Sequence, residues 1–293
     1  MVGFTEGVPC WAEAMLPDLA AGKRFYGELF GWTFESGGYA RAFHRERSVG
    51  ALVHKRDGRM PTVWTVYFAA PDLAGTVRRV HAAGGRVVAG PQPAGDGSAA
   101  LAADPEGAVF GLWQSVGHPG FDRQQQVMSF CWAEVYARDA AVVDPFYAAV
   151  FGYGATDLGE GGQLRVWSPA GSAPGPDAAV AGRILIGDSF PPEMPSHFLV
   201  YFRVPDCDAA AATVVRLGGR VQLAPTDTPY GRIAVFADDQ GADFGVLQDD
   251  EDRTPPGDDP EATQECDVLA DPDPGGGAAG GSADRPQGTG EDA

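Results

Sequence analysis

The sequence is poor in basic residues and has no long apolar run. Its 293 residues include 21 Lys and Arg against 40 Asp and Glu, which gives a formal net charge of -19. Such an acidic chain repels nucleic acid and anionic membrane surfaces, so we expect neither as a partner. No apolar stretch reaches the ~18 residues of a membrane-spanning helix, and the first residues lack the basic and apolar segments of a signal peptide. The composition therefore predicts a cytoplasmic protein.

Cysteine is also scarce. The four cysteines show no C-x-x-C spacing, so the sequence indicates neither a zinc knuckle nor a disulfide framework. Cys10 and Cys131 lie within apolar stretches, where a free cysteine usually packs as a small buried hydrophobe. We expect reduced cysteines without a catalytic role.

Most of the negative charge lies at the C-terminal end. Residues 249–293 hold fourteen acidic residues and two arginines, are rich in Gly and Pro, and lack aromatic side chains. A segment of this composition cannot bury enough apolar surface to offset the entropy lost on ordering. We therefore predict a disordered acidic tail over residues 249–293.

The stretch Cys-Trp-Ala-Glu occurs twice, at residues 10–13 and 131–134. One block of matches has a constant offset of 121 residues: Trp11 with Trp132, Glu13 with Glu134, Phe25 with Phe146, Tyr26 with Tyr147, and Phe30 with Phe151. A later block has an offset of 134: Tyr67 with Tyr201, Gly84 with Gly218, and Asp104 with Asp238. The chain is therefore predicted to be a duplicated domain, residues 7–117 and 127–248, joined by a polar linker at 118–126.

Each predicted domain contains a further half-repeat. A strand ends in a Pro-Asp or Arg-Asp turn, an alanine-rich helix follows, and more strands complete the unit. In the first helix, residues 19–31, Phe25, Leu29 and Phe30 recur at helical spacing. The unit is βαβββ, each domain is two such units, and the fold class is α+β.

These motifs resemble a known superfamily. C-W-x-E followed by F-Y-x-x-x-F-G-W, then G-G-R-V and A-D-P-E-G-A-V-F-G-L, cover nearly all of residues 8–248 and are similar to the vicinal oxygen chelate proteins, the glyoxalase, bleomycin-resistance and extradiol dioxygenase group. The tandem arrangement resembles actinobacterial proteins named as glyoxylases or hydroxylases. The resemblance implies two domains, in each of which two βαβββ units form a cupped sheet that binds ligands on its concave face.

The candidate binding residues follow from strand alternation. Trp11 and Glu13, like Trp132 and Glu134, share one strand face, and small residues share the other. In the second half-repeats Thr65, Tyr67, Leu199 and Tyr201 share the equivalent face, whereas a one-residue slip would place Trp64, Val66, Phe198 and Val200 there. Two alternative interpretations stay open. In one, the tryptophans fill core volume; in the other, each Glu pairs with a nearby Arg. The PTDTPYGR loop adds Tyr230 and Arg232, which we expect to close over a ring in the second cup.

The resemblance also indicates where a metal would bind, and the residues there do not suit one. The family's ligand positions correspond to Trp11, Thr65 and Gly111 in the first domain, with the apolar stretch 49–53, and to Trp132, Leu199 and Gly245 in the second, with the stretch 180–185. Apolar side chains and glycine cannot hold a divalent ion. Of the five histidines, His197 lies nearest to such a position. We expect no metal ligands and no cofactor.

A metal-free cup with aromatic walls suits a planar ligand, because Trp and Tyr rings stack on it and a carboxylate selects an amine or hydroxyl. The predicted function is binding of an aromatic natural product, such as an aromatic polyketide or anthracycline, for self-resistance or to assist a tailoring enzyme in its biosynthesis. The predicted ligand contacts are Trp11, Glu13, Tyr67, Trp132, Glu134, Tyr201, Tyr230 and Arg232. The alternative is a metal-free enzyme, a lyase or isomerase, with Glu13 or Glu134 as general base. Between these two the sequence does not decide.

Overall fold

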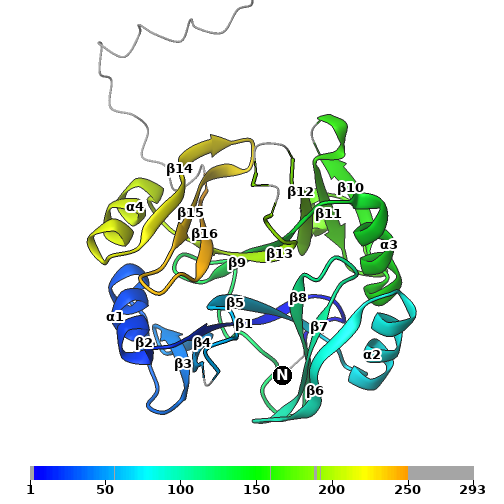
Figure 1. The fold of residues 1–293 in the computed structure, drawn as a ribbon, viewed down its shortest axis with the longest axis horizontal. Coiled ribbons are helices and arrows are strands. Elements are labelled where there is room, and N and C mark those ends of the chain that lie inside the picture. Colours follow the sequence, from blue (N-terminus) through cyan, green and yellow to red (C-terminus); the bar gives the residue numbers. More distant parts are fainter. Residues whose placement is uncertain (1–2, 56, 159, 188–189, 192, 250–293) are drawn as a thin grey trace, which may run out of the picture. The chain divides into compact units, whose positions relative to one another are not determined.

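The computed structural model describes residues 3–55, 57–158, 160–187, 190–191 and 193–249, and these form two eight-stranded sheets with four α-helices (Figure 1). Apart from Asp249, the predicted acidic tail lies outside the described residues. The helices and short 3-10 turns are α1 (Leu19–Phe30), α2 (Leu73–Ala82), α3 (Ala140–Phe151), α4 (Cys207–Arg216), η1 (Glu160–Gly162) and η2 (Pro176–Ala178). Among the described residues, no helix has both the length and the apolar character needed to cross a membrane.

The first sheet has the strand order β2-β3-β4-β1-β5-β8-β7-β6. Its strands are β1 (Pro9–Leu16), β2 (Thr33–Phe34), β3 (Tyr39–His44), β4 (Arg47–His54), β5 (Val63–Ala69), β6 (Arg86–Ala94), β7 (Gly97–Ala103) and β8 (Val109–Ser115). The two βαβββ units meet where β1 pairs antiparallel with β5.

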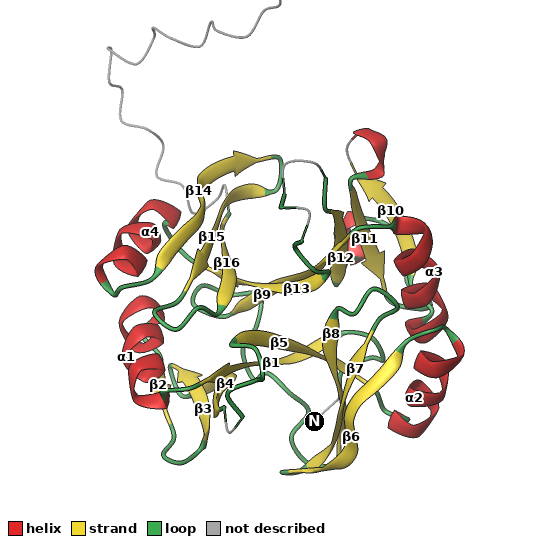
Figure 2. Ribbon diagram, viewed as in Figure 1, coloured by secondary structure: helices red, strands yellow, loops and turns green. Residues whose placement is uncertain are grey.

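The second sheet repeats this topology, with the order β10-β11-β12-β9-β13-β16-β15-β14. Its strands are β9 (Phe130–Ala137), β10 (Gly154–Leu158), β11 (Leu164–Ser168), β12 (Ala181–Leu185), β13 (His197–Arg203), β14 (Arg220–Thr228), β15 (Gly231–Ala237) and β16 (Asp243–Gln248). Figure 2 shows both sheets curving into cups with the helices outside them. The predicted α+β class, with tandem vicinal oxygen chelate domains built from βαβββ units, is confirmed.

An aspartate begins every α-helix. The side chains of Asp18, Asp72, Asp139 and Asp206 accept hydrogen bonds from backbone N–H groups of the first helical turn. These groups have no partner within the helix, so an N-cap Asp stabilises it by about 1 kcal/mol. The Pro-Asp and Arg-Asp turns that mark the four half-repeats are therefore the helix starts.

The two sheets pack against each other through their convex faces. Trp64 and Phe68 of β5 contact Phe202 and Phe198 of β13, with ring centroids 4.9 and 5.6 Å apart. Trp64 is 3% exposed and Phe202 is fully buried. These side chains occupy the face opposite Tyr67 and Tyr201, so the one-residue slip considered from the sequence does not occur.

Two buried hydrogen bonds join the domains through the repeated Phe-Tyr and Asp-x-x-Gly motifs. The Tyr26 hydroxyl donates to Asp238 at 2.9 Å, and the Tyr147 hydroxyl donates to Asp104 at 3.0 Å. Figure 1 accordingly shows α1 beside α4 and α2 beside α3. The described part of the chain falls within one compact unit, so the boundaries at 117 and 127 stay predictions.

Candidate functional site

The concave face of each sheet carries the repeated Trp and Glu. In the first sheet Trp11 lies opposite Tyr67 and Glu13 opposite Thr65; in the second, Trp132 lies opposite Tyr201 and Glu134 opposite Leu199. Side chains of directly paired residues point to the same face of a sheet, so each cup gathers a Trp, a Glu and a Tyr on its two central strands. We refer to the concave face of β1–β8 as cup 1 and to that of β9–β16 as cup 2.

In cup 1 two tyrosines lie at the carboxylate of Glu13. The Tyr67 hydroxyl donates to Glu13 Oε1 at 2.7 Å, and the Tyr39 hydroxyl is near enough to lower the pKa of this carboxyl. The Trp11 indole N–H donates to the Tyr39 hydroxyl oxygen at 3.0 Å. Tyr39 belongs to β3, the strand between β2 and β4, and was not predicted, because no motif of the sequence ties β3 to β1.

Cup 2 builds a similar cluster with a different second tyrosine. The Tyr201 hydroxyl donates to Glu134 Oε1 at 2.6 Å, and the Trp132 indole N–H donates to Glu134 Oε2 at 3.1 Å. The hydroxyls of Tyr136 and Tyr201 lie 3.3 Å apart. Tyr136 comes from β9 itself, so the second tyrosine of each cup is supplied by a strand that is not equivalent in the repeat.

Burial dominates the acidity of both carboxyl groups. It raises the pKa of Glu13 and of Glu134 above the usual value near 4.5, while hydrogen bonds from the tyrosines lower it again in part. Glu134 is 5% exposed, whereas Glu13 is half-buried. The same burial, together with the neighbouring Glu, raises the pKa of Tyr67 and Tyr201, so these hydroxyls keep their protons at neutral pH.

The hydrogen atoms of these clusters point inward, toward the carboxylates. Each tyrosine has one hydroxyl proton and each indole one N–H, and Tyr67, Tyr201 and Trp132 donate theirs directly to a Glu. The lone pairs that remain on the tyrosine and carboxylate oxygens can only accept. A ligand that meets an ionised cluster therefore has to bring a hydrogen-bond donor, such as an ammonium or a phenolic hydroxyl.

The two alternatives from the sequence fare differently in the structure. Among the ion pairs found within the described residues, none involves Glu13 or Glu134, so the arginine pairing is not seen there. Trp11 does contribute to the core, being 7% exposed, while Trp132 is only half-buried. The core-filling interpretation thus applies to Trp11 more than to Trp132.

The donor set of the cups does not fit the metal that this fold can hold. The positions expected from the family carry Trp11, Thr65 and Gly111, or Trp132, Leu199 and Gly245. Gly111 and Gly245 lie under the rings of Tyr67 and Tyr201, where even a Cβ atom would come within 2.1 and 2.3 Å of a ring carbon. A ligand side chain therefore has no room there. In the described part of the chain, no three or more His, Cys, Asp or Glu side chains come together in a way that could hold a metal ion.

Access to the two cups differs. The linker passes over Trp11: the ring centroids of His118 and Phe121 lie 5.3 and 5.5 Å from the ring centroid of Trp11. The linker is held there by the hydrogen bond that the Phe121 N–H donates to the Cys10 carbonyl at 2.8 Å.

Cys10 and Cys131 are buried and free, as predicted, and burial raises the pKa of both thiols.

The structure places two predicted contacts outside the clusters. Arg232 pairs with Asp208 of α4 and with Asp227, each at 2.9 Å, because it lies on the helix-facing side of β15 with the buried Ala234 and Phe236. Tyr230 lies in the turn before β15 and is 52% exposed. The expectation that Arg232 closes over cup 2 is therefore wrong: the loop motif was read without the strand face on which Arg232 falls.

His197, the histidine nearest to an expected metal-ligand position, is held by contacts within the protein. Its ring stacks on Tyr136, with centroids 5.2 Å apart and planes 9° apart. Its Nδ1 lies 2.9 Å from the Pro195 carbonyl oxygen. His197 thus extends the aromatic wall of cup 2 at Tyr136.

Comparisons with known proteins agree on the fold and on the relatives. A glyoxalase-like domain family model matches residues 13–113. The anthracycline biosynthesis protein DauV of Streptomyces sp. strain C5 is 35% identical, and DnrV of Streptomyces peucetius 34% identical, both covering 85% of this chain and 95% of the relative. CFP32 of Mycobacterium bovis, which carries a provisional glyoxylase name, is 34% identical over 84% of this chain and 96% of the relative.

Solved structures share the fold at low sequence identity. The Mn(II)-bound glyoxalase of Novosphingobium aromaticivorans aligns with a TM-score of 0.59 and 16% identity, covering 84% of each chain. The 2,3-dioxygenase LapB of Pseudomonas sp. KL28 aligns with a TM-score of 0.58 and 13% identity, covering 84% of this chain and 93% of the other.

Proposed function

Because the chain belongs to the glyoxalase-like family of the vicinal oxygen chelate superfamily, with anthracycline biosynthesis proteins among its relatives, we propose that it binds a planar aromatic natural product in its cups without a metal ion. The ligand class is an aromatic polyketide of the anthracycline type. Its role is to serve the biosynthesis of such a compound, by holding it for a tailoring enzyme or by sequestering it for self-resistance.

One observation carries this proposal: each cup places an indole and two phenol rings around one carboxylate, buried in cup 2 and half-buried in cup 1. The rings offer flat apolar surfaces, and the carboxylate with its tyrosines offers acceptors. Hydroxylated or aminated fused-ring compounds combine a flat apolar body with donor groups at the edge. The donor set, unsuited to a metal, favours binding over the metal-dependent reactions of other members of the fold.

A second candidate function is metal-free proton transfer. The raised pKa of Glu13 and Glu134 is what a general base near neutral pH requires, and the protonated Glu can then return the proton to another atom of the substrate. In this case the Glu would take a proton from an acidic C–H or phenol of the substrate. Glu13, half-buried, is the more accessible of the two.

The two functions are separated by following binding and turnover in one experiment. Aromatic polyketides of differing hydroxylation are titrated into the protein with EDTA present, while the ligand itself is analysed by chromatography. Quenching of tryptophan fluorescence without any change in the ligand supports binding. Conversion that Glu13→Gln or Glu134→Gln abolishes, with affinity retained, supports the enzyme.

A further inference from the structure

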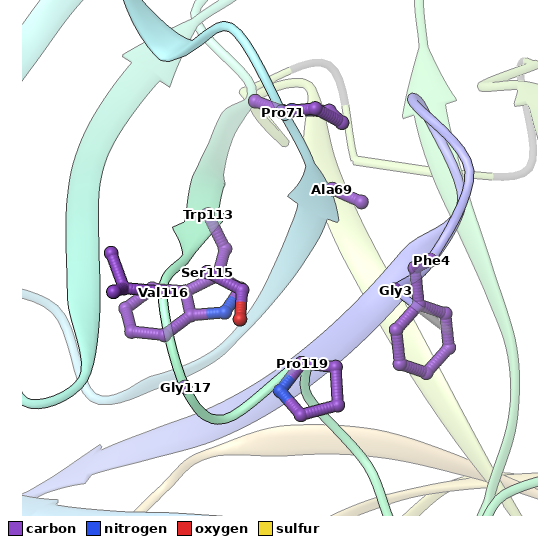
Figure 3. A pocket seen from close by; sticks show the side chains of 10 residues that line it. Gly3, Phe4, Ala69, Pro71, Trp113, Ser115, Val116, Gly117 and Pro119 are labelled. Atoms are coloured by element: carbon purple, nitrogen blue, oxygen red, sulfur yellow. The ribbon is translucent and has the colours of Figure 1, made fainter. Parts of the chain in front are cut away.

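A pocket of about 360 Å³ lies at one end of cup 1, away from Glu13. Figure 3 shows Phe4 and Trp113 on opposite sides of it, with Pro71 and Pro119 at its two ends and Ala69 between them. Apart from Ser115, the side chains that line it are apolar, while polar atoms contribute a substantial part of its surface. The volume is near the lower end of the ~300–1,000 Å³ typical of small-molecule sites, so the pocket suits part of a large ligand.

This pocket continues the surface of the Glu13 cluster. Ala69 follows Tyr67 by two residues on β5, so both point into cup 1. On the neighbouring strand β8, Gly111 pairs with Tyr67 and Trp113 pairs with Ala69. On β5 and β8 the concave face therefore runs past Tyr67 to the pocket wall formed by Trp113, beside the linker that covers Trp11.

The aromatic wall of the pocket is fixed in place before any ligand binds. The Trp113 indole N–H donates to the His118 carbonyl at 3.1 Å, which holds the ring against the linker. On its other side the ring packs on Gly97, where a Cβ atom would come within 2.8 Å of it. A wall held by a hydrogen bond and close packing loses little conformational entropy on binding.

The second domain fills the equivalent place with charge. Arg203 stands where the first domain has Ala69, and Leu247 where it has Trp113, as the pairing of β13 with β16 shows. Arg203 forms an ion pair with Asp249 in which both side chains are about one quarter exposed. The pocket is thus a property of the first domain alone and is not part of the repeated pattern.

We propose that this pocket is the ring-binding subsite of cup 1 and takes the apolar end of a fused-ring aromatic ligand between Phe4 and Trp113. The inference rests on the proposed function and adds where in cup 1 the ligand lies. The donor group of the ligand faces the Glu13 cluster, and its apolar rings lie beyond Tyr67. Cup 2, which lacks this pocket, binds smaller aromatic molecules or binds the same one more weakly.

The test uses 2-hydroxyanthraquinone as the probe and full-length protein labelled with 5-fluorotryptophan, whose six tryptophans are followed by ¹⁹F NMR. We expect the Trp113 resonance, identified by its loss in Trp113→Leu, to shift on titration. Ala69→Arg and Trp113→Leu install the residues of the second domain and should weaken binding about tenfold, through the lost space and stacking. Val215→Ala, on the exposed face of α4, is the matched control and should bind as the wild type does.

The outcomes separate the pocket from the wider proposal. If the Trp11 or Trp132 resonance shifts while Trp113 stays unchanged, and Ala69→Arg binds normally, the pocket inference is overturned and the proposed function stands. If no tryptophan resonance shifts, both are overturned. Should Ala69→Arg fail to fold, Phe4→Ala decides, because Phe4 precedes β1 and is only half-buried; unchanged affinity in that variant would also refute the subsite.

Discussion

The ring of Tyr201 lies over Gly245 of the neighbouring parallel strand, so closely that a Cβ atom at residue 245 would come within 2.3 Å of it. This contact lets the Tyr201 hydroxyl reach Glu134 at 2.6 Å. Tyr67 and Gly111 repeat the arrangement in cup 1. In each domain, the glycine on the last of the family's ligand positions leaves the space that the tyrosine ring fills. The tyrosine therefore lies where a metal-ligand side chain would otherwise project.

Gly245→Ala should displace the Tyr201 ring and break its bond to Glu134. Overpacking of this kind costs about 1–3 kcal/mol of unfolding free energy. We expect a lower melting temperature, a changed near-ultraviolet circular dichroism spectrum and weaker ligand binding in cup 2. Gly38→Ala, where no atom lies within 4 Å of the added carbon, serves as the control. A variant as stable as the wild type would mean that the ring has room to move.

The two repeated tryptophans should respond differently to truncation. Trp11→Ala removes a 7% exposed ring packed by the linker, so it should cost about 3 kcal/mol or more and lower the melting temperature by roughly 6 °C or more. Trp132→Ala removes a half-buried ring and should destabilise the protein less. It should also weaken the binding of an aromatic ligand in cup 2 several-fold, because stacking is lost. Equal losses of stability in calorimetry would contradict this difference.

The buried Glu134 should make the protein less stable as the pH rises. In the folded protein the pKa of Glu134 is raised above its usual value near 4.5, so folding favours the protonated form. The stability from this group is fully present below about pH 4.5 and is lost as the pH rises through the raised pKa. The fall in melting temperature above pH 4.5 should be shallower in Glu134→Gln than in the wild type.

Glu28→Gln is the control for this pH series. Glu28 is about half exposed and pairs with Arg216, so it lacks the burial that acts on Glu134. Its profile should follow that of the wild type. Parallel profiles for Glu134→Gln and the wild type would show that the Glu134 carboxyl titrates in the folded protein as it does in the unfolded chain.

Metal removal should change neither stability nor binding. Gly111, Gly245 and the two tryptophans leave the family's ligand positions without donors. EDTA should leave the melting temperature and ligand affinity within error, and elemental analysis of purified protein should find far less than one metal ion per chain. Stoichiometric zinc, nickel, iron or manganese would refute this account, and His197 and His54 would be the first residues to replace.

The sequence predicts the features that the duplication repeats. Because Trp11, Glu13 and Tyr67 each recur at a constant offset, the fold, the register and the faces of the central strands can be predicted without a structure. Tyr39 and Tyr136 break the repeat, since one hydroxyl comes from β3 and the other from the central strand β9. Strand alternation places Tyr136 on the face of Glu134, whereas nothing in the spacing brings Tyr39 to Glu13.

Two further features depend on tertiary contacts that no motif encodes. The linker was predicted only as a polar connection, yet Phe121 and His118 cover Trp11. Arg232 was placed over the cup from the composition of its loop, whereas the alternation of β15 turns it toward Asp208 of α4. Both differences arise because a loop's neighbours are set by packing between elements far apart in the sequence.

The central claim is that the cups bind a hydroxylated fused-ring aromatic molecule and leave it unchanged. The most direct measurement is a titration of 2-hydroxyanthraquinone and its methyl ether into the protein with EDTA present, recording tryptophan quenching, heat and the recovered ligand together. The account predicts saturable binding of the hydroxy compound, at least several-fold weaker binding of the ether, and full recovery of both. Equal affinity for the two compounds, or conversion of either one that is lost in Glu13→Gln or Glu134→Gln, would contradict it.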